Sequence, residues 1–122
     1  MNSHLAVVSL YAANLDESVK FYRDVIGLYL VSEGAGHPHF RLDGTYLVLL
    51  QGKPQPAQET DGERFPVIAL AVDDLDGALE RLRANGTPLP WSVEADARAR
   101  WVMFHDPAGN LIELVQSMRG VI

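Results

Sequence analysis

The sequence predicts an α+β fold built from two βαβββ modules in tandem, each with a helix packed on one face of a mixed sheet. An internal repeat is the first observation behind this prediction: VVSLYAANLDESVKFYR, from Val7, aligns without gaps on VIALAVDDLDGALERLR, from Val67. A second match sets DGTYLVLLQ, from Asp43, against AGNLIELVQ, from Ala108. The other observation is that each half changes from strand-like apolar runs to helical periodicity in the same order.

The first half begins with a β-branched apolar run at 6–11, which is typical of a short strand. A helix is expected next, because apolar residues from Val19 to Ile26 recur at helical spacing. Either Asn14 or Asp16 can cap its start, and Gly27 is a suitable C-terminal breaker. Phe21 and Tyr22 then fill the helix–sheet interface, and three strands follow at 29–33, 39–42 and 46–51.

The second half repeats this plan, with a strand at 67–72 and a helix for which Asp74 or Asp76 provides the cap. Asn85 and Gly86 end that helix, and strands are expected at 89–93, 101–105 and 111–116. The stretch between the halves is rich in proline and glycine and has little apolar periodicity. We therefore predict one domain over 1–122, made of module one at 1–52, a linker at 53–65 and module two at 66–122.

Composition excludes several classes of function. The net charge is −6 and the ten Lys and Arg residues are scattered, so no basic face is expected for nucleic acid. No apolar run approaches the roughly 20 residues that span a bilayer, which argues against a membrane role. The chain has no cysteine and no basic stretch ahead of its first apolar run, so neither a disulfide framework nor secretion is indicated. A cytoplasmic location is expected.

Two sequence elements carry a resemblance to a known family. NLDESVKFYRDVIGL at 14–28 and DPAGNLIEL at 106–114, in this order and with this spacing, resemble the vicinal oxygen chelate superfamily, the group of glyoxalases, bleomycin-resistance proteins and dioxygenases. The resemblance covers nearly the whole chain. It implies that the two modules form a cup for a small molecule, with helices on the outer face, and that the protein is a homodimer.

The resemblance also places a divalent metal at four positions of this sequence: Val7, Val48, Val67 and Glu113. The internal repeat makes Val48 and Glu113 equivalent as well. A catalytic metal ion commonly takes three protein ligands with oxygen, nitrogen or sulfur donors, which three valines and a glutamate do not supply. No cofactor is therefore predicted, and a divalent metal is disfavoured.

Strand alternation predicts which residues line the cup. If Val48 and Glu113 face it, residues two positions away on the same strand do too. Phe40, Val102 and Phe104 suit the core. Their neighbours along each strand are therefore expected to face the cup. The predicted ligand-binding residues are Ser9, Tyr11, His39, Arg41, Tyr46, Val48, Val67, Trp101, Met103 and Glu113.

Three hypotheses for function follow. The first is a metal-independent protein that binds or sequesters a small, partly apolar or aromatic molecule, as an antibiotic-resistance protein does. The second is an enzyme of isomerase, lyase or dioxygenase type in which Glu113 is the catalytic base or a residual metal ligand, with Tyr11, His39 or Arg41 positioning the substrate. The third is a metal enzyme with displaced ligands at His37, His39 and Glu113. A structural alternative for Glu113 is an ion pair with Arg41 or another arginine.

Overall fold

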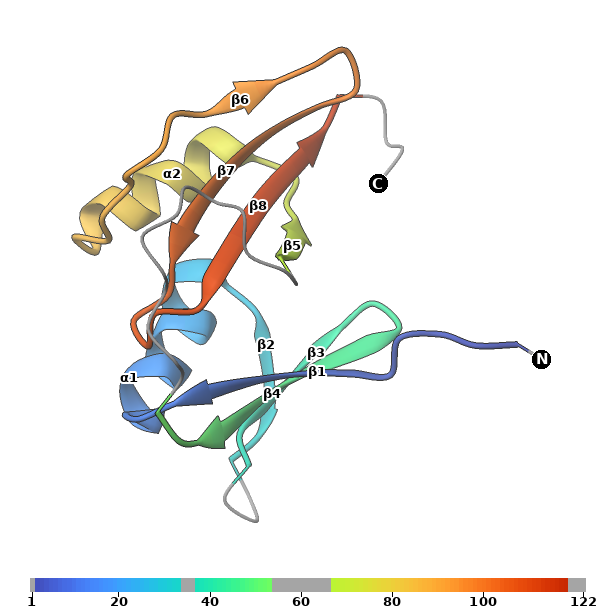
Figure 1. Cartoon of the computed structure of the whole chain (residues 1–122), viewed down its shortest axis with the longest axis vertical. Helices are drawn as coiled ribbons and strands as arrows, with labels where there is room; N and C mark the ends of the chain where they lie inside the picture. The colour runs from blue at the N-terminus through green and yellow to red at the C-terminus, as the bar shows by residue number, and fades with distance from the viewer. Residues whose placement is uncertain (1, 34–36, 54–66, 119–122) are drawn as a thin grey trace. The chain divides into compact units, whose positions relative to one another are not determined.

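The computed structural model describes residues 2–33, 37–53 and 67–118. The chain divides into two compact units, Met1–Gln55 and Pro56–Ile122. The first contains β1 (Val7–Ala12), α1 (Leu15–Lys20), η1 (Phe21–Ile26), β2 (Tyr29–Ser32), β3 (His39–Leu42) and β4 (Thr45–Gln51) (Figure 1). The second contains β5 (Ile68–Ala71), α2 (Leu75–Ala84), β6 (Glu94–Ala95), β7 (Ala99–His105) and β8 (Leu111–Ser117).

Both units form a mixed sheet with the same topology. The strand order is β1-β4-β3-β2 in one and β5-β8-β7-β6 in the other. In each unit the first and last strands pair in parallel, and the remaining pairs are antiparallel. The parallel pair requires a long crossover, which the helix and the intervening strands provide. The predicted α+β class and the tandem βαβββ order are confirmed.

The two helices begin at the first of the two caps proposed for each. The Asn14 side-chain oxygen accepts a hydrogen bond from the Glu17 backbone N–H at 3.1 Å, and Asp74 accepts one from the Gly77 N–H at 3.0 Å. Asp16 and Asp76 lie in the first helical turn, where a negative side chain interacts favourably with the positive end of the helix dipole. Each residue type is therefore suited to its place, but only the first of each pair caps the backbone.

A π-helical segment continues the first helix. It covers Phe21–Ile26 and ends at Gly27, which has a φ of 88°. Phe21 and Tyr22 are buried, and the Tyr22 ring lies 6.0 Å from that of Phe40 on β3, as expected for a helix–sheet interface. The core beneath it is completed by Leu10, Ala12, Val19, Ile26, Leu47 and Leu49.

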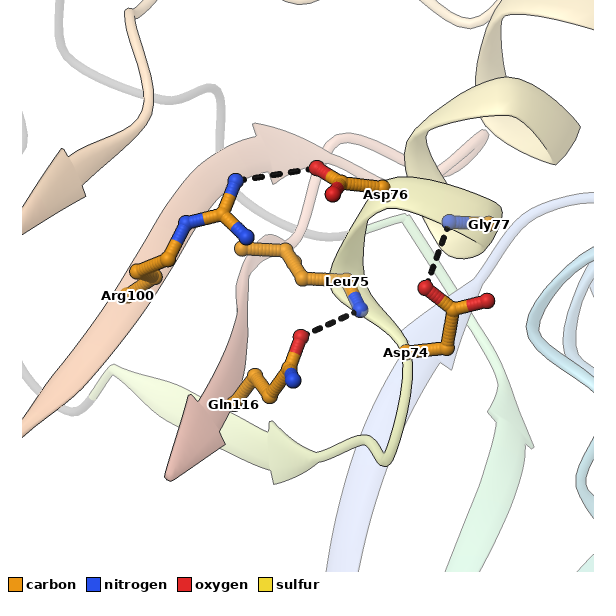
Figure 2. A network of polar contacts seen from close by, with 6 residues as sticks. All are labelled: Asp74, Leu75, Asp76, Gly77, Arg100 and Gln116. Carbon is orange, nitrogen blue, oxygen red and sulfur yellow. Dashed lines mark hydrogen bonds and ion pairs between the residues drawn. The ribbon is translucent and has the colours of Figure 1, made fainter. Parts of the chain in front are cut away.

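The start of α2 is tied to two strands of its own sheet (Figure 2). The Leu75 backbone N–H donates to Gln116 Oε1 on β8 at 2.8 Å, and Arg100 on β7 forms an ion pair with Asp76 at 2.9 Å. These contacts hold the helix over the sheet face that carries the core side chains Leu70, Val102, Phe104, Ile112 and Leu114. The repeat-equivalent Gln51 also reaches the segment before its helix, where Nε2 donates to the Ala13 carbonyl at 2.7 Å.

The predicted strand at 89–93 is wrong. In the structure the edge strand β6 is only Glu94–Ala95, paired with Trp101 and Arg100 of β7. Pro88 and Pro90 have no backbone N–H to donate to a ladder, so the preceding segment does not pair. None of the helices in the described ranges has the length and apolar character needed to cross a lipid bilayer.

Candidate functional site

The helix-free face of the first sheet carries all the predicted binding residues of that unit. Ser9 pairs with Val48 across β1 and β4, and His39 pairs with Val48 across β3 and β4. Because cross-strand partners share a face of the sheet, this register aligns the side chains on one side. The helix-free face of the first sheet is made by Val7, Ser9, Tyr11, His39, Arg41, Tyr46, Val48 and Leu50.

Aromatic and basic groups dominate this face. Tyr11 and Tyr46 are 51% and 42% exposed, and the His39 ring lies 6.0 Å from that of Tyr46 in an edge-on arrangement. The Arg41 guanidinium lies 4.7 Å above the centre of the Tyr29 ring, a cation–π geometry. These contacts fix the directions of His39 and Arg41 within the unit.

The helix-free face of the second sheet carries most of the remaining predicted residues. Glu113 on β8 lies between its partners Ala69 on β5 and Met103 on β7, and Trp101 pairs with Val115. Val67 lies one residue before β5 begins. The helix-free face of the second sheet is made by Ala69, Ala71, Glu94, Trp101, Met103, His105, Leu111, Glu113 and Val115. The cup expected from both modules together stays a prediction.

Glu113 is a half-buried carboxylate on an apolar surface. Burial raises the pKa of Glu113 above its usual value, and the negative charge of Glu94 raises it further. Within the described part of its own unit, residues 67–118, no side chain forms a hydrogen bond or ion pair with it. Of the arginines considered as its partner, Arg100 of the same unit binds Asp76 instead, and a pairing with Arg41 of the first unit stays a prediction.

Two contacts on this face were missed by sequence reasoning. The Trp101 indole N–H donates to Glu94 Oε2 at 3.2 Å, and the rings of Trp91 and His105 lie 5.3 Å apart. The misplaced strand at 89–93 concealed the first contact, because Glu94 pairs with Trp101 only when β6 begins at Glu94. Neither Trp91 nor His105 is among the predicted ligand-binding residues.

Comparison with protein families identifies the chain. Residues 4–114 match the model of the Glyoxalase/Bleomycin resistance protein/Dioxygenase superfamily. The chain belongs to this superfamily. The resemblance of the elements at 14–28 and 106–114 to vicinal oxygen chelate proteins is thereby confirmed.

Individual superfamily members extend the comparison. Over 69 residues the chain is 30% identical to metallothiol transferase FosB of Staphylococcus epidermidis, covering 57% of this chain and 49% of that protein. The chain thus spans about half the length of this curated relative. A lactoylglutathione lyase structure from Agrobacterium tumefaciens is 27% identical with a TM-score of 0.70, covering 95% of each chain. TnmS3, an antibiotic binding protein from a Streptomyces species, shares the fold at 24% identity and a TM-score of 0.70, covering 95% of this chain and 97% of that one.

The superfamily's metal can be tested against the residues present. In the first unit, Val48 lies between its cross-strand partners Ser9 and His39, so these partners bring one imidazole and no carboxylate. In the second unit, Glu113 is flanked by Ala69 and Met103. Within the described part of each unit, no three His, Cys, Asp or Glu side chains gather as a metal-binding group. These residues do not fit the divalent ion that the resemblance implies.

Proposed function

We propose that the protein binds a small, partly apolar or aromatic molecule on its helix-free sheet faces without a divalent metal ion. The observation that supports this most strongly is the composition of the positions where the superfamily places its metal. Val7, Val48 and Val67 have no donor atoms, and Glu113 is the remaining carboxylate. Small-molecule sites are mainly apolar and aromatic, with a few polar groups that orient the ligand.

The residues proposed to bind the ligand on each of the two faces have complementary roles. Tyr11, Tyr46 and Trp101 provide aromatic surface on strands that hold them at fixed positions. Ser9, His39 and Arg41 supply hydrogen-bond donors, and Glu113 supplies an acceptor. Val48, Val67 and Met103 complete the apolar part.

Fluorescence titration with N-phenyl-1-naphthylamine, a neutral aromatic probe, tests this proposal. The full chain is purified in chelator and titrated before and after addition of zinc, manganese, nickel or cobalt. We expect saturable binding in chelator that no metal strengthens, with weaker binding by Trp101→Ala and unchanged binding by Glu80→Gln on the exposed face of α2. Binding that requires an added metal, or the absence of binding, would contradict the proposal.

A second candidate function is an enzyme that uses Glu113 as a general base. The raised pKa of Glu113, which has no ion-pair partner within residues 67–118, favours it, because a base works best when its pKa lies near the working pH. Glu113→Gln separates the two candidates. A base is abolished by this change, with a loss of at least about 10²-fold in kcat, whereas a binding protein keeps most of its affinity for a neutral ligand.

The remaining expectations about partners and location come from the resemblance and from composition. The proposed partner is the small-molecule ligand itself. A homodimer stays a prediction, which light scattering on the full chain would test. A cytoplasmic location also stays a prediction.

A further inference from the structure

The charged groups of the second unit are unevenly distributed over its sheet. The helix-free face carries the carboxylates of Glu94 and Glu113, and no lysine or arginine within residues 67–118 lies on it. Arg100 points to the opposite side, where it pairs with Asp76 of α2. Arg81 and Arg83 belong to α2, and Arg98 lies in the turn before β7. This face is therefore negative without a compensating cation of its own.

An aromatic ring is held between the two carboxylates of this face. Trp101 is the cross-strand partner of Glu94, and its indole N–H is bound by Glu94 Oε2. Glu113 lies diagonally across from Trp101, since the direct partner of Trp101 is Val115. The hydrogen bond engages the edge of the partly exposed indole and does not occupy its π-face. The face of a tryptophan ring is the best aromatic surface for a positive charge.

Apolar side chains surround this arrangement. Glu113 is flanked by Ala69 and Met103 across the sheet and by Leu111 and Val115 along β8. The two carboxylates repel each other, and burial disfavours the charged form of Glu113. A positive charge placed between them would relieve both effects. A bare divalent ion would not be held well, because one Glu94 oxygen is already engaged and few other oxygen donors are near.

We infer that the helix-free face of the second sheet recognises an organic monocation with an aromatic or apolar body, through the Trp101 ring and the carboxylates of Glu94 and Glu113. This inference rests on the proposed function and names the class of its ligand. The cation lies against the indole and the carboxylates, and the apolar body lies on Met103 and Ala69, which flank Glu113 across the sheet. Charge complementarity selects this occupant over a neutral or anionic molecule of the same shape.

Three probes with the same ring and different charge test the inference on the full chain. They are benzyltrimethylammonium, benzyl alcohol and benzoate, titrated by calorimetry and by tryptophan fluorescence. We expect the cation to bind at least tenfold more tightly than the alcohol, and benzoate to bind more weakly than either. Raising the salt concentration from 20 to 500 mM should weaken binding of the cation several-fold and leave binding of the alcohol unchanged, because salt screens only the charged contact.

Variants assign the effect to this face. Glu113→Gln and Glu94→Gln each keep a hydrogen-bonding amide in place of the carboxylate, and each should reduce the cation's advantage over the alcohol by about fivefold or more. Glu80→Gln removes the same charge from the exposed side of α2 and should leave the advantage intact. Trp101→Leu should weaken binding of the cation more than binding of the alcohol.

The outcomes distinguish this inference from the proposed function. If the alcohol binds as tightly as the cation, or if N-phenyl-1-naphthylamine binds and the cation does not, the inference is overturned and the proposed function stands. A cation preference that survives both Glu113→Gln and Glu94→Gln also overturns the inference. If neither the neutral probes nor the cation binds, both are contradicted.

Discussion

Glu113 and Asp76 belong to the same unit, but their surroundings shift their pKa values in opposite directions. The hydrogen bond and charge of Arg100 lower the pKa of exposed Asp76, whereas burial raises the pKa of Glu113. A hydrogen-bond donor stabilises the charged form of a carboxylate. Partial burial on an apolar surface without such a donor destabilises the charged form. The contrast marks Glu113 as a residue whose charge opposes folding.

The pH dependence of stability should show the free-energy cost of holding a charged Glu113 in the folded protein. Because folding raises the pKa of Glu113, its contribution destabilises the protein at pH values above the folded pKa and vanishes below the unfolded pKa of about 4.3. We expect Glu113→Gln to raise Tm at pH 7 by roughly 1–3 °C and to have no effect at pH 3.5. Circular dichroism melts at both values test this, with Glu80→Gln as the control. A lower Tm for Glu113→Gln at pH 7 would contradict the assignment.

Tyr11 and Gly52 form a close contact at the edge of the first sheet. A Cβ placed on Gly52 would lie 2.6 Å from Cδ1 of the Tyr11 ring, near the stem of the side chain where it cannot easily move away. Gly52→Ala should therefore destabilise the protein by about 1–3 kcal/mol. In a Tyr11→Ala background the same change should cost much less, which denaturant titration of the four proteins in this mutant cycle would measure. Equal costs in both backgrounds would show that the ring is not the obstacle.

Residue faces were predictable from the sequence, but residue partners were not. Alternation along a strand placed Ser9, His39 and Arg41 on one face because its period is fixed at two. The contacts of Arg41 with Tyr29 and of Trp101 with Glu94 depend on which residues lie opposite across neighbouring strands. That register is set by β2 and β6, whose pairing no single-strand pattern reveals. The roles assigned to the site residues stay predictions.

The start of α1 offers a test at the level of an element. Asn14 caps the helix, whereas Asp16 lies in its first turn. Asn14→Ala should cost about 1 kcal/mol through the lost cap, and Asp16→Ala only about 0.3–0.5 kcal/mol through the lost interaction with the helix dipole. Urea unfolding of the two single variants gives both values. An equal or larger cost at Asp16 would mean that the cap does not hold in solution.

Elements with a strong pattern were predicted closely, and those decided by a local backbone constraint were not. The strand predicted at 39–42 has those bounds in the structure. The edge strand before β7 was misplaced, because apolar residues in 89–93 suggested pairing that Pro88 and Pro90 prevent. The π-helical form of Phe21–Ile26 was not predicted either, since apolar residues at helical spacing fit both helix types.

At the scale of the whole molecule, the valines at three of the four positions where the resemblance implies a metal predict a weak affinity for divalent metal. The full chain, purified without chelator and incubated in turn with zinc, manganese, iron, nickel and cobalt, should retain well under one ion per chain after desalting. Elemental analysis measures this directly. Near one ion per wild-type chain would contradict the argument from the valines.

The repeat in the sequence predicted the topology of the molecule because both halves keep the same order of strands and helix. The two sheets show that order strand for strand, and the superfamily match extends over 4–114. Most of the predicted linker at 53–65 lies outside the described residues. Function does not follow from the fold alone, since the same architecture occurs in a lyase and in an antibiotic binding protein.

Gln51 and Gln116 occupy equivalent places in the repeat, yet they use opposite ends of the same amide. Gln51 donates to a carbonyl, and Gln116 accepts from a backbone N–H. If the repeat arose by duplication, one ancestral glutamine could have served both copies while their loops diverged, because an amide suits either neighbour. A glutamate could replace only Gln116 without losing the bond. Identical residues at equivalent positions of a duplicated protein can therefore be under different selection, and each copy will tolerate a different set of replacements.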